Sequence, residues 1–122
     1  MRTNYVLVDY ENVQLASLHG LNSEQFKVLV FVGASQSKIS LGFATSMQTL
    51  GDRAQYVQIT GNGHNALDFH IAFYLGRLAT QDPDAYFHVI SRDTGFDPLI
   101  EHLRSRQTPV MRSASIESRW QW

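Results

Sequence analysis

Apolar residues recur along the chain in short, nearly continuous runs, and most of these runs are closed by an acidic residue or a glycine. Runs of this length, rich in β-branched and aromatic residues, are typical of strands that are buried on both faces of a sheet. The last run is the weakest. The predicted strands are Tyr5–Val8, Phe26–Val32, Tyr56–Ile59, Tyr86–Ile90 and Pro109–Met111.

The segments between these runs carry apolar residues close to helical spacing, which predicts helices at Ile39–Leu50, Ala66–Ala79 and Asp97–Arg104. Pro98 suits the first position of the last helix, after an Asp97 cap. Strand and helix alternate throughout, so we expect a three-layer α/β/α sandwich with a mostly parallel five-stranded sheet. Right-handed crossovers favour the strand order 3-2-1-4-5.

The chain has 122 residues, which is the size of one compact domain. We expect residues 1–112 to form that domain and residues 113–122 to form an irregular tail. The tail ends in Trp120-Gln121-Trp122, which suggests packing on a neighbour, on a partner subunit or on a continuation of the chain.

Composition narrows the class of protein. Hydrophobic residues make up 43% of the chain, which is enough for one core. The absence of cysteine excludes disulfides, thiolate zinc sites and a cysteine nucleophile. No apolar run is long enough to cross a bilayer, and the start lacks a secretory signal, so we expect a cytoplasmic protein without membrane contact.

The charge balance argues against a protein that grips nucleic acid by bulk positive charge. Ten basic and eleven acidic residues give a formal net charge of −1. Basic residues are nevertheless frequent beyond Ser91, beginning with Arg92, and that end of the molecule becomes positive if its acids bind metal.

Two of the predicted strands, the first and the fourth, are followed closely by an aspartate. Asp9 closes the first strand, and Asp93 follows the fourth. In the expected strand order these strands are neighbours, and the order reverses between them, which is where such sheets bind ligands. Adjacent strands lie about 4.8 Å apart, so the two carboxylates could share a cation.

Two further acids are expected at the same edge of the sheet. Asp68 lies near the start of the second predicted helix, and Asp97 lies at the start of the third. Both also have structural explanations, because Asp97 is a good helix cap and Asp68 with Asn65 resembles a capping box. Converging carboxylates repel one another, and Mg²⁺ or Mn²⁺ would relieve the repulsion.

Three segments together resemble the motifs of the PIN-like and NYN domain ribonucleases. The resemblance spans roughly Tyr5 to Arg112, with the acids in matching order and strand positions. An aspartate closes the first strand and an asparagine follows, a central acid lies on a helix, and a closing motif follows the fourth strand. The segments are Val8-Asp9-Tyr10-Glu11-Asn12-Val13, Asn65-Ala66-Leu67-Asp68-Phe69 and Ser91-Arg92-Asp93-Thr94-Gly95-Phe96-Asp97-Pro98-Leu99.

The resemblance implies a metal-dependent endoribonuclease that hydrolyses RNA with one or two Mg²⁺ or Mn²⁺ ions. Asp9, Asp68 and Asp93 would be the acidic ligands, with Asp97 binding a metal directly or through water. Asn12 would orient Asp9 or the scissile phosphate. Ser91 and Thr94 either hydrogen-bond the third acid or serve as turn residues. Much of the family acts as toxins of toxin–antitoxin or defence systems, which adds a homodimer and an antitoxin or other protein partner to the expectations.

Two features depart from the family pattern. Many members carry a glutamate on the central helix, where this chain has the shorter Asp68. Glu11 is an additional acid that either substitutes as a ligand or faces solvent.

Two loops are candidate RNA contacts. Gly61–Asn65 could close over the substrate with His64 near the scissile phosphate, although its glycines also suit a plain turn. Gly33–Lys38 could hold a phosphate through backbone amides and Lys38, but it lacks the signature of a nucleotide-binding P-loop.

Other functions stay open. The first alternative is a non-catalytic RNA-binding or scaffold module on the same fold. A nuclease acting on DNA would need a duplex-binding insertion, which the chain lacks. A flavodoxin-like signalling domain would need a lysine after the last strand, where only Arg112 and Ser113 follow Met111.

Overall fold

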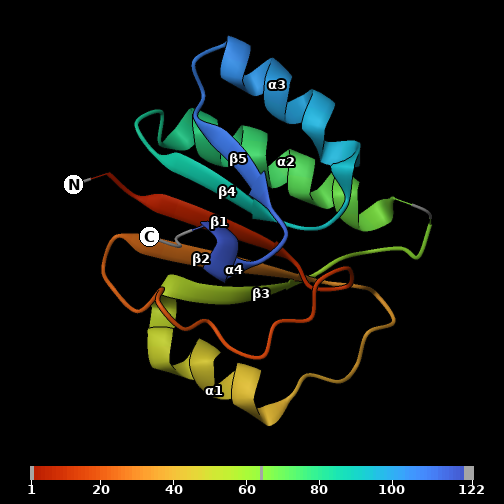
Figure 1. Ribbon diagram of the computed structural model, residues 1–122. Coiled ribbons are helices and arrows are strands. Elements are labelled where there is room, and N and C mark those ends of the chain that lie inside the picture. The colour runs from red at the N-terminus through yellow and green to blue at the C-terminus, as the bar shows by residue number, and fades with distance from the viewer. Residues whose placement is uncertain (1, 64, 120–122) are drawn as a thin grey trace.

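The computed structural model describes residues 2–63 and 65–119 and contains one five-stranded sheet (Figure 1). Its strand order is β3-β2-β1-β4-β5, and every neighbouring pair is parallel, which confirms the predicted topology. The strands are β1 (Asn4–Asp9), β2 (Phe26–Val32), β3 (Ala54–Gln58), β4 (Tyr86–Ile90) and β5 (Val110–Ser113).

Helices cover both faces of the sheet, giving three layers (Figure 1). Two of the helical elements are short 3₁₀ turns. No helix in the described part of the chain is long and apolar enough to cross a membrane. The helical elements are α1 (Leu41–Leu50), η1 (Gly51–Arg53), α2 (Ala66–Gln81), η2 (Thr94–Phe96), α3 (Asp97–Ser105) and α4 (Ile116–Arg119).

Side chains of the central strands alternate between two separate cores, because successive residues of a strand point to opposite faces. From β1, Val6 and Val8 pack with Phe43 of α1, whereas Leu7 packs with Ile71 of α2. Burial of such side chains contributes about 1.5–3 kcal/mol each, so both faces stabilise the sheet. The apolar runs reflect this burial on both sides.

The observed element boundaries differ from the predicted ones by a few residues, for local reasons. The first helix begins at Leu41 rather than Ile39, because the Ser40 side chain caps it by accepting a hydrogen bond of 3.2 Å from the Phe43 N–H. The third strand begins and ends earlier than predicted, at Ala54 and Gln58.

The prediction that Asp97 caps the third helix is wrong. Asp97 is already the first residue of α3, and the residue before it, Phe96, makes no side-chain cap. Asp93 caps η2 instead, because its carboxylate accepts a hydrogen bond of 2.8 Å from the Gly95 N–H. Asp97 is therefore free to pair with another residue.

The segment expected to be an irregular tail is partly regular. Ser113 ends β5, and α4 follows at Ile116–Arg119. Ile116 is only 4% exposed and packs in the core beneath α1, which holds this segment against the sheet. The predicted docking of Trp120-Gln121-Trp122 lies outside the described residues.

Candidate active site

An acidic pocket of about 200 Å³ lies at the carboxyl edge of the sheet, beside the first turn of α2. Carboxylates and amides dominate its lining, and none of the described residues that line it is basic. The lining residues are Asp9, Glu11, Asn12, Asn65, Ala66, Leu67, Asp68 and Asp93.

Asp9 is almost completely buried at the end of β1, with 3% of its surface exposed. Its Oδ2 accepts a hydrogen bond of 2.8 Å from the Ser91 hydroxyl, and its Oδ1 accepts one of 3.3 Å from the Asn12 N–H. Burial raises the pKa of Asp9, these two bonds lower it, and the neighbouring charges of Glu11 and Asp93 raise it further. The sum of these effects places the pKa of Asp9 above its ordinary value. This position therefore disfavours the ionised carboxylate unless a positive charge lies nearby.

Asn12 joins the loop after β1 to the loop after β4. Its backbone N–H contacts Asp9, and its side-chain oxygen accepts a hydrogen bond of 2.7 Å from the Arg92 N–H. The side chain thus fixes the position of the second loop, and the expected contact with Asp9 is made by the backbone. The predicted contact of Asn12 with a phosphate stays a prediction.

Ser91 connects the first and third acids. Its hydroxyl donates to Asp9 and accepts a hydrogen bond of 3.0 Å from the Asp93 N–H. The expected bond from Ser91 to the third carboxylate is therefore directed to the first one. Thr94 is exposed, and the Gly95 N–H donates a hydrogen bond to the Asp93 carboxylate. A Cβ at Gly95 would come within 2.9 Å of Asp93 Oδ1, so glycine permits this close turn.

Asp68 approaches Asp93 from the first turn of α2. Asn65 begins this helix in the left-handed conformation (φ 65°) and makes no side-chain cap, so the capping box is not formed. Burial raises the pKa of Asp68 to about 7, together with a hydrogen bond to the Asp93 carboxyl and the charges of Asp93, Asp9 and Glu11. A carboxyl pair of this kind shares a proton, because two adjacent negative charges are costly.

Asp97 does not line the pocket. Its carboxylate accepts hydrogen bonds from Arg112, of 2.8 Å to Oδ1 and 3.3 Å to Oδ2, and these bonds hold its pKa below the ordinary value. Arg112 also donates a hydrogen bond of 3.1 Å to the carbonyl of Ser91. Sequence reasoning missed this role of Arg112. Its only signal was a basic residue directly after the apolar part of the last strand.

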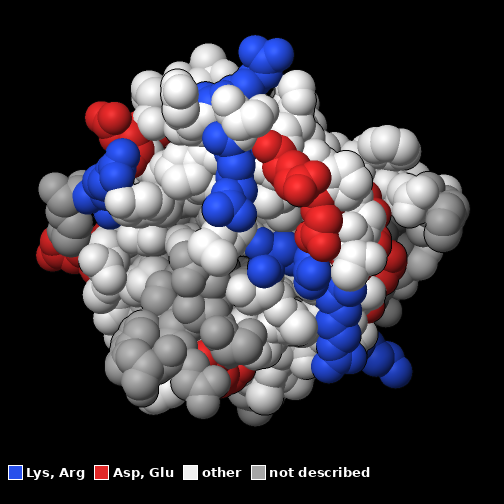
Figure 2. Space-filling model, turned by 45° about the horizontal axis from the view of Figure 1, so that its top comes forward, with Lys and Arg blue, Asp and Glu red and all other residues white. Residues whose placement is uncertain are grey.

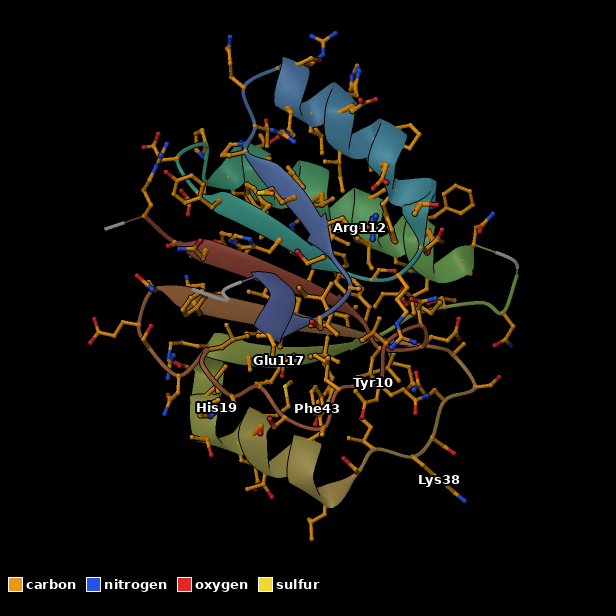
Figure 3. All side chains as sticks on the ribbon, in the orientation of Figure 1. Tyr10, His19, Lys38, Phe43, Arg112 and Glu117 are labelled. Carbon is orange, nitrogen blue, oxygen red and sulfur yellow. The ribbon has the colours of Figure 1, made fainter. Side chains whose placement is uncertain are left out.

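The remaining candidates lie around the pocket. Glu11 is exposed and still lines it, with its carboxylate against Gly33. Arg92 is exposed, and its backbone N–H bonds to Asn12. Lys38 extends into solvent from the loop after β2 (Figure 3). His64 lies outside the described residues.

The donor chemistry of the pocket suits a hard cation, although its carboxylates are not gathered around one point. Within residues 2–63 and 65–119, no group of three His, Asp or Glu side chains is arranged as a metal site. Asp9 and Asp93 are each turned towards local donors, namely Ser91 and Gly95. Carboxylate oxygens are the ligands that Mg²⁺ and Mn²⁺ prefer.

The chain is a three-layer α/β/α protein, and its acidic pocket lies where the strand order reverses, which is the place where sheets of this class generally bind ligands. The family model described as PIN domain matches residues 3–113. The chain belongs to the PIN domain family, whose members are generally metal-dependent nucleases. No curated protein and no solved structure matches the chain. The NYN part of the resemblance stays a prediction.

Proposed function

We propose that this PIN domain is a metal-dependent endoribonuclease that hydrolyses RNA phosphodiester bonds at the acidic pocket. The observation that supports this most strongly is that Asp9, Asp68 and Asp93 line one pocket, although they come from β1, α2 and the loop after β4. No basic side chain among the described lining residues balances their charge. Such a set costs stability, and a site that binds one or two Mg²⁺ or Mn²⁺ ions gives a reason for it.

In this proposal the three aspartates hold the cation, and their neighbours keep them in position. Ser91 and the Asn12 N–H orient the Asp9 carboxylate, and the Gly95 N–H orients that of Asp93. When bound, the metal would lower the pKa of an attacking water and stabilise charge on the phosphate. We assign Asp97 to positioning the Ser91 loop through Arg112. The prediction that it reaches a metal, directly or through water, stays a prediction.

The surface beside the pocket offers cations to an RNA backbone. Figure 2 shows Lys and Arg side chains at several places on one face of the molecule, with one group next to a row of acidic side chains. Arg92 follows directly on the Ser91 loop, and Lys38 extends from the loop after β2. We propose that these two residues contact phosphates of the substrate, because phosphate contacts position a strand without reading its sequence.

The biological setting that we propose is a toxin–antitoxin or defence system in the cytoplasm, with a homodimer and an antitoxin or other protein as partners. The second candidate function is a non-catalytic RNA-binding module. It is favoured by the absence, among the described residues, of a preformed group of three metal-binding side chains.

Cleavage of single-stranded and structured RNA with Mg²⁺, Mn²⁺ or EDTA tests the proposal. We expect metal-dependent internal cleavage that Asp9→Asn and Asp93→Asn each lower by at least about 100-fold, since each removes a charged ligand. Glu101→Gln, on the exposed surface of α3, is the control and should cleave normally. RNA binding without cleavage, equal in all four proteins, would favour the binding module instead.

A further inference from the structure

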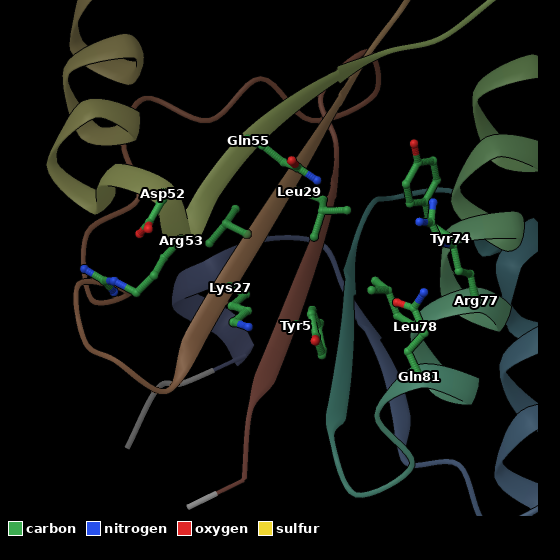
Figure 4. A pocket seen from close by; sticks show the side chains of 11 residues that line it. Tyr5, Lys27, Leu29, Asp52, Arg53, Gln55, Tyr74, Arg77, Leu78 and Gln81 are labelled. Carbon is green, nitrogen blue, oxygen red and sulfur yellow. The ribbon is translucent and has the colours of Figure 1, made fainter.

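A second cavity, of about 270 Å³, lies between α2 and the amino-terminal halves of β1 and β2 (Figure 4). It is separate from the acidic pocket. Tyr5 lines it, and Asp9 lies four residues further along the same strand, which corresponds to about 13 Å at roughly 3.3 Å per residue. Both cavities border α2, with Asp68 in its first turn and Gln81 at its end.

Cations and amides line this second cavity together. Lys27 points from β2 towards the ring of Tyr5, with its Nζ 5.9 Å from the ring centroid (Figure 4). Arg77 and Gln81 come from α2, and Gln55 comes from β3 (Figure 4). Arg77 and Lys27 therefore place two positive charges on opposite walls.

Asp52 and Arg53 of η1 also line this cavity and carry one charge of each sign, so they do not cancel the two cations. Arg53 points away from α2, and its guanidinium donates hydrogen bonds to the Ser23 carbonyl (2.5 Å) and the Asn22 side chain (2.8 Å) (Figure 4). Asp52 also lies on that far side (Figure 4). The charge of Asp82, next to the end of α2, also acts on Tyr5 and raises its pKa after burial does. Lys27 and Arg77 outweigh this one acid, so the surroundings of the cavity carry net positive charge.

Lys27 and Gln55 lie at sheet positions next to buried residues, on the face that α2 covers further along. Lys27 pairs with buried Tyr5, and Gln55 pairs with buried Leu29. Further along the same face of β2, Phe31 is packed beneath Tyr74 of α2. Lys27 and Gln55 are both exposed, so α2 does not cover this part of the sheet and leaves both polar side chains open to a ligand.

We propose that this second cavity binds one nucleotide. Its phosphate would pair with Lys27 and Arg77, and its base would bond to the amides of Gln55 and Gln81 beside the ring of Tyr74. Arginine, lysine and glutamine are suited to phosphate oxygens and to the edges of unpaired bases. The nucleotide is either a unit of an RNA strand or a free mononucleotide.

That the bound nucleotide is a unit of an RNA strand rests on the proposed ribonuclease function. The surface of α2 favours this occupant over a free mononucleotide. Arg77 lies nine positions after Asp68, which is about 13 Å along a helix. Between them Phe69 and Phe73 are 71% and 62% exposed, four residues apart and so on one face of the helix. Exposed aromatic rings offer stacking platforms to bases of a single strand.

Binding is measured first, in EDTA so that no strand is cut. Fluorescence anisotropy with a labelled single-stranded RNA of ten nucleotides compares the native protein with Lys27→Gln/Arg77→Gln. The control Arg104→Gln/Arg106→Gln removes the same charge from the end of α3, away from both cavities. We expect about tenfold weaker binding for the first variant, a salt slope lower by roughly 1.4, and no change for the control.

Two further experiments distinguish an RNA strand from a free mononucleotide as the occupant, and the nucleotide site from the ribonuclease proposal. Adenosine 5′-monophosphate and inorganic phosphate are titrated into ¹⁵N-labelled protein, where shifts of the Gln55 and Gln81 amides report the cavity. Cleavage is then measured in Mg²⁺ or Mn²⁺. If the nucleotide is a unit of an RNA strand, Lys27→Gln/Arg77→Gln should raise KM for the ten-nucleotide RNA about tenfold, with kcat and cleavage of a dinucleotide unchanged. Shifts with the mononucleotide but an unchanged KM identify a free nucleotide as the occupant.

Other results overturn the proposal. Equal RNA binding by native protein and variant, together with no mononucleotide shift, excludes a nucleotide site. Shifts as large with inorganic phosphate as with the mononucleotide reduce the cavity to an anion site. If no RNA is cut but the variant binds RNA more weakly, the nucleotide site stands and the ribonuclease proposal fails. If the native protein and the variant cleave RNA equally and neither RNA nor mononucleotide binding depends on Lys27 and Arg77, the ribonuclease proposal stands and the nucleotide site fails.

Discussion

At the scale of single residues, the acidic pocket depends on a few hydrogen bonds that keep its carboxylates close together. The Ser91 hydroxyl lies between Asp9 and the Asp93 N–H, and the Asp68 carboxyl is bonded to that of Asp93. The raised pKa of Asp68, about 7, records the cost of ionising one more group there. The same cost is what a bound metal would offset.

The Asp68→Asn substitution should therefore stabilise the protein in the absence of metal and destabilise it, relative to the native protein, when metal is added. An acid with a raised pKa holds its proton in the folded state between about pH 4 and pH 7, so stability falls as pH rises through that window. In EDTA at pH 8 the variant should be more stable by about 1 kcal/mol after allowance for solvent screening, or roughly 3–6 °C in Tm.

In 10 mM Mg²⁺ the native protein should gain more than the variant, and the order of Tm should reverse. Thermal unfolding at pH 5 and pH 8, with and without metal, measures both effects. At pH 5 in EDTA the difference should shrink, because Asp68 is then protonated in the native protein. A variant that is less stable than the native protein in EDTA at pH 8 would contradict the raised pKa.

At the scale of elements, Arg112 of β5 ties the start of α3 to the end of β4. It bonds the Asp97 carboxylate and the Ser91 carbonyl at once, so it fixes the loop that carries Asp93. The ion pair itself is partly exposed, with 48% of the Asp97 side chain accessible, and pairs of this kind add little to stability. The importance of the ion pair is that it positions the loop that carries Asp93.

Arg112→Gln should lower RNA cleavage and Mn²⁺ affinity about tenfold, which is typical of residues that orient metal ligands. Asp97→Asn should cost less than Asp93→Asn, because Asp97 lies outside the pocket and Arg112 keeps its bond to Ser91. Initial rates at several Mn²⁺ concentrations separate affinity from turnover. An Asp97→Asn variant as inactive as Asp93→Asn would instead make Asp97 a ligand.

The short helix α4 is the other element with a measurable role. Ile116→Ala should destabilise the fold by about 2 kcal/mol, because it leaves a cavity in the core beneath α1. Glu117→Ala, its exposed neighbour, should change stability by less than about 0.5 kcal/mol. Urea unfolding measures both variants. Equal effects would mean that this segment is not part of the packed domain.

At the scale of the whole molecule, the sequence predicted the parts of the fold that local patterns determine. Runs such as Phe26–Val32 are apolar on both faces, so they had to be inner strands, and alternation with helices then restricted the order. The positions of Asp9 and Asp93 followed from that order. Ile116 lies outside any clear periodic pattern, so α4 was missed.

The side-chain partners in the site could not be read from the sequence. Whether Asp97 caps a helix, binds a metal or pairs with Arg112 depends on the distance between α3 and β5, which no local pattern specifies. The hydrogen bond between Asp68 and Asp93 likewise depends on how α2 lies against the sheet. No local pattern distinguishes Lys27 and Gln55, because they line the second cavity only where α2 leaves the sheet uncovered.

The central claim is that the acidic pocket of this PIN domain binds a divalent cation, and titration of Mn²⁺ tests it most directly. Electron paramagnetic resonance of free Mn²⁺ gives the bound fraction for the native protein and for Asp9→Asn, with Glu101→Gln as control. We predict saturable binding of one or two ions by the native protein and the control, and at least about tenfold weaker binding by Asp9→Asn. Equal binding by all three proteins, or none by the native protein, would contradict the account.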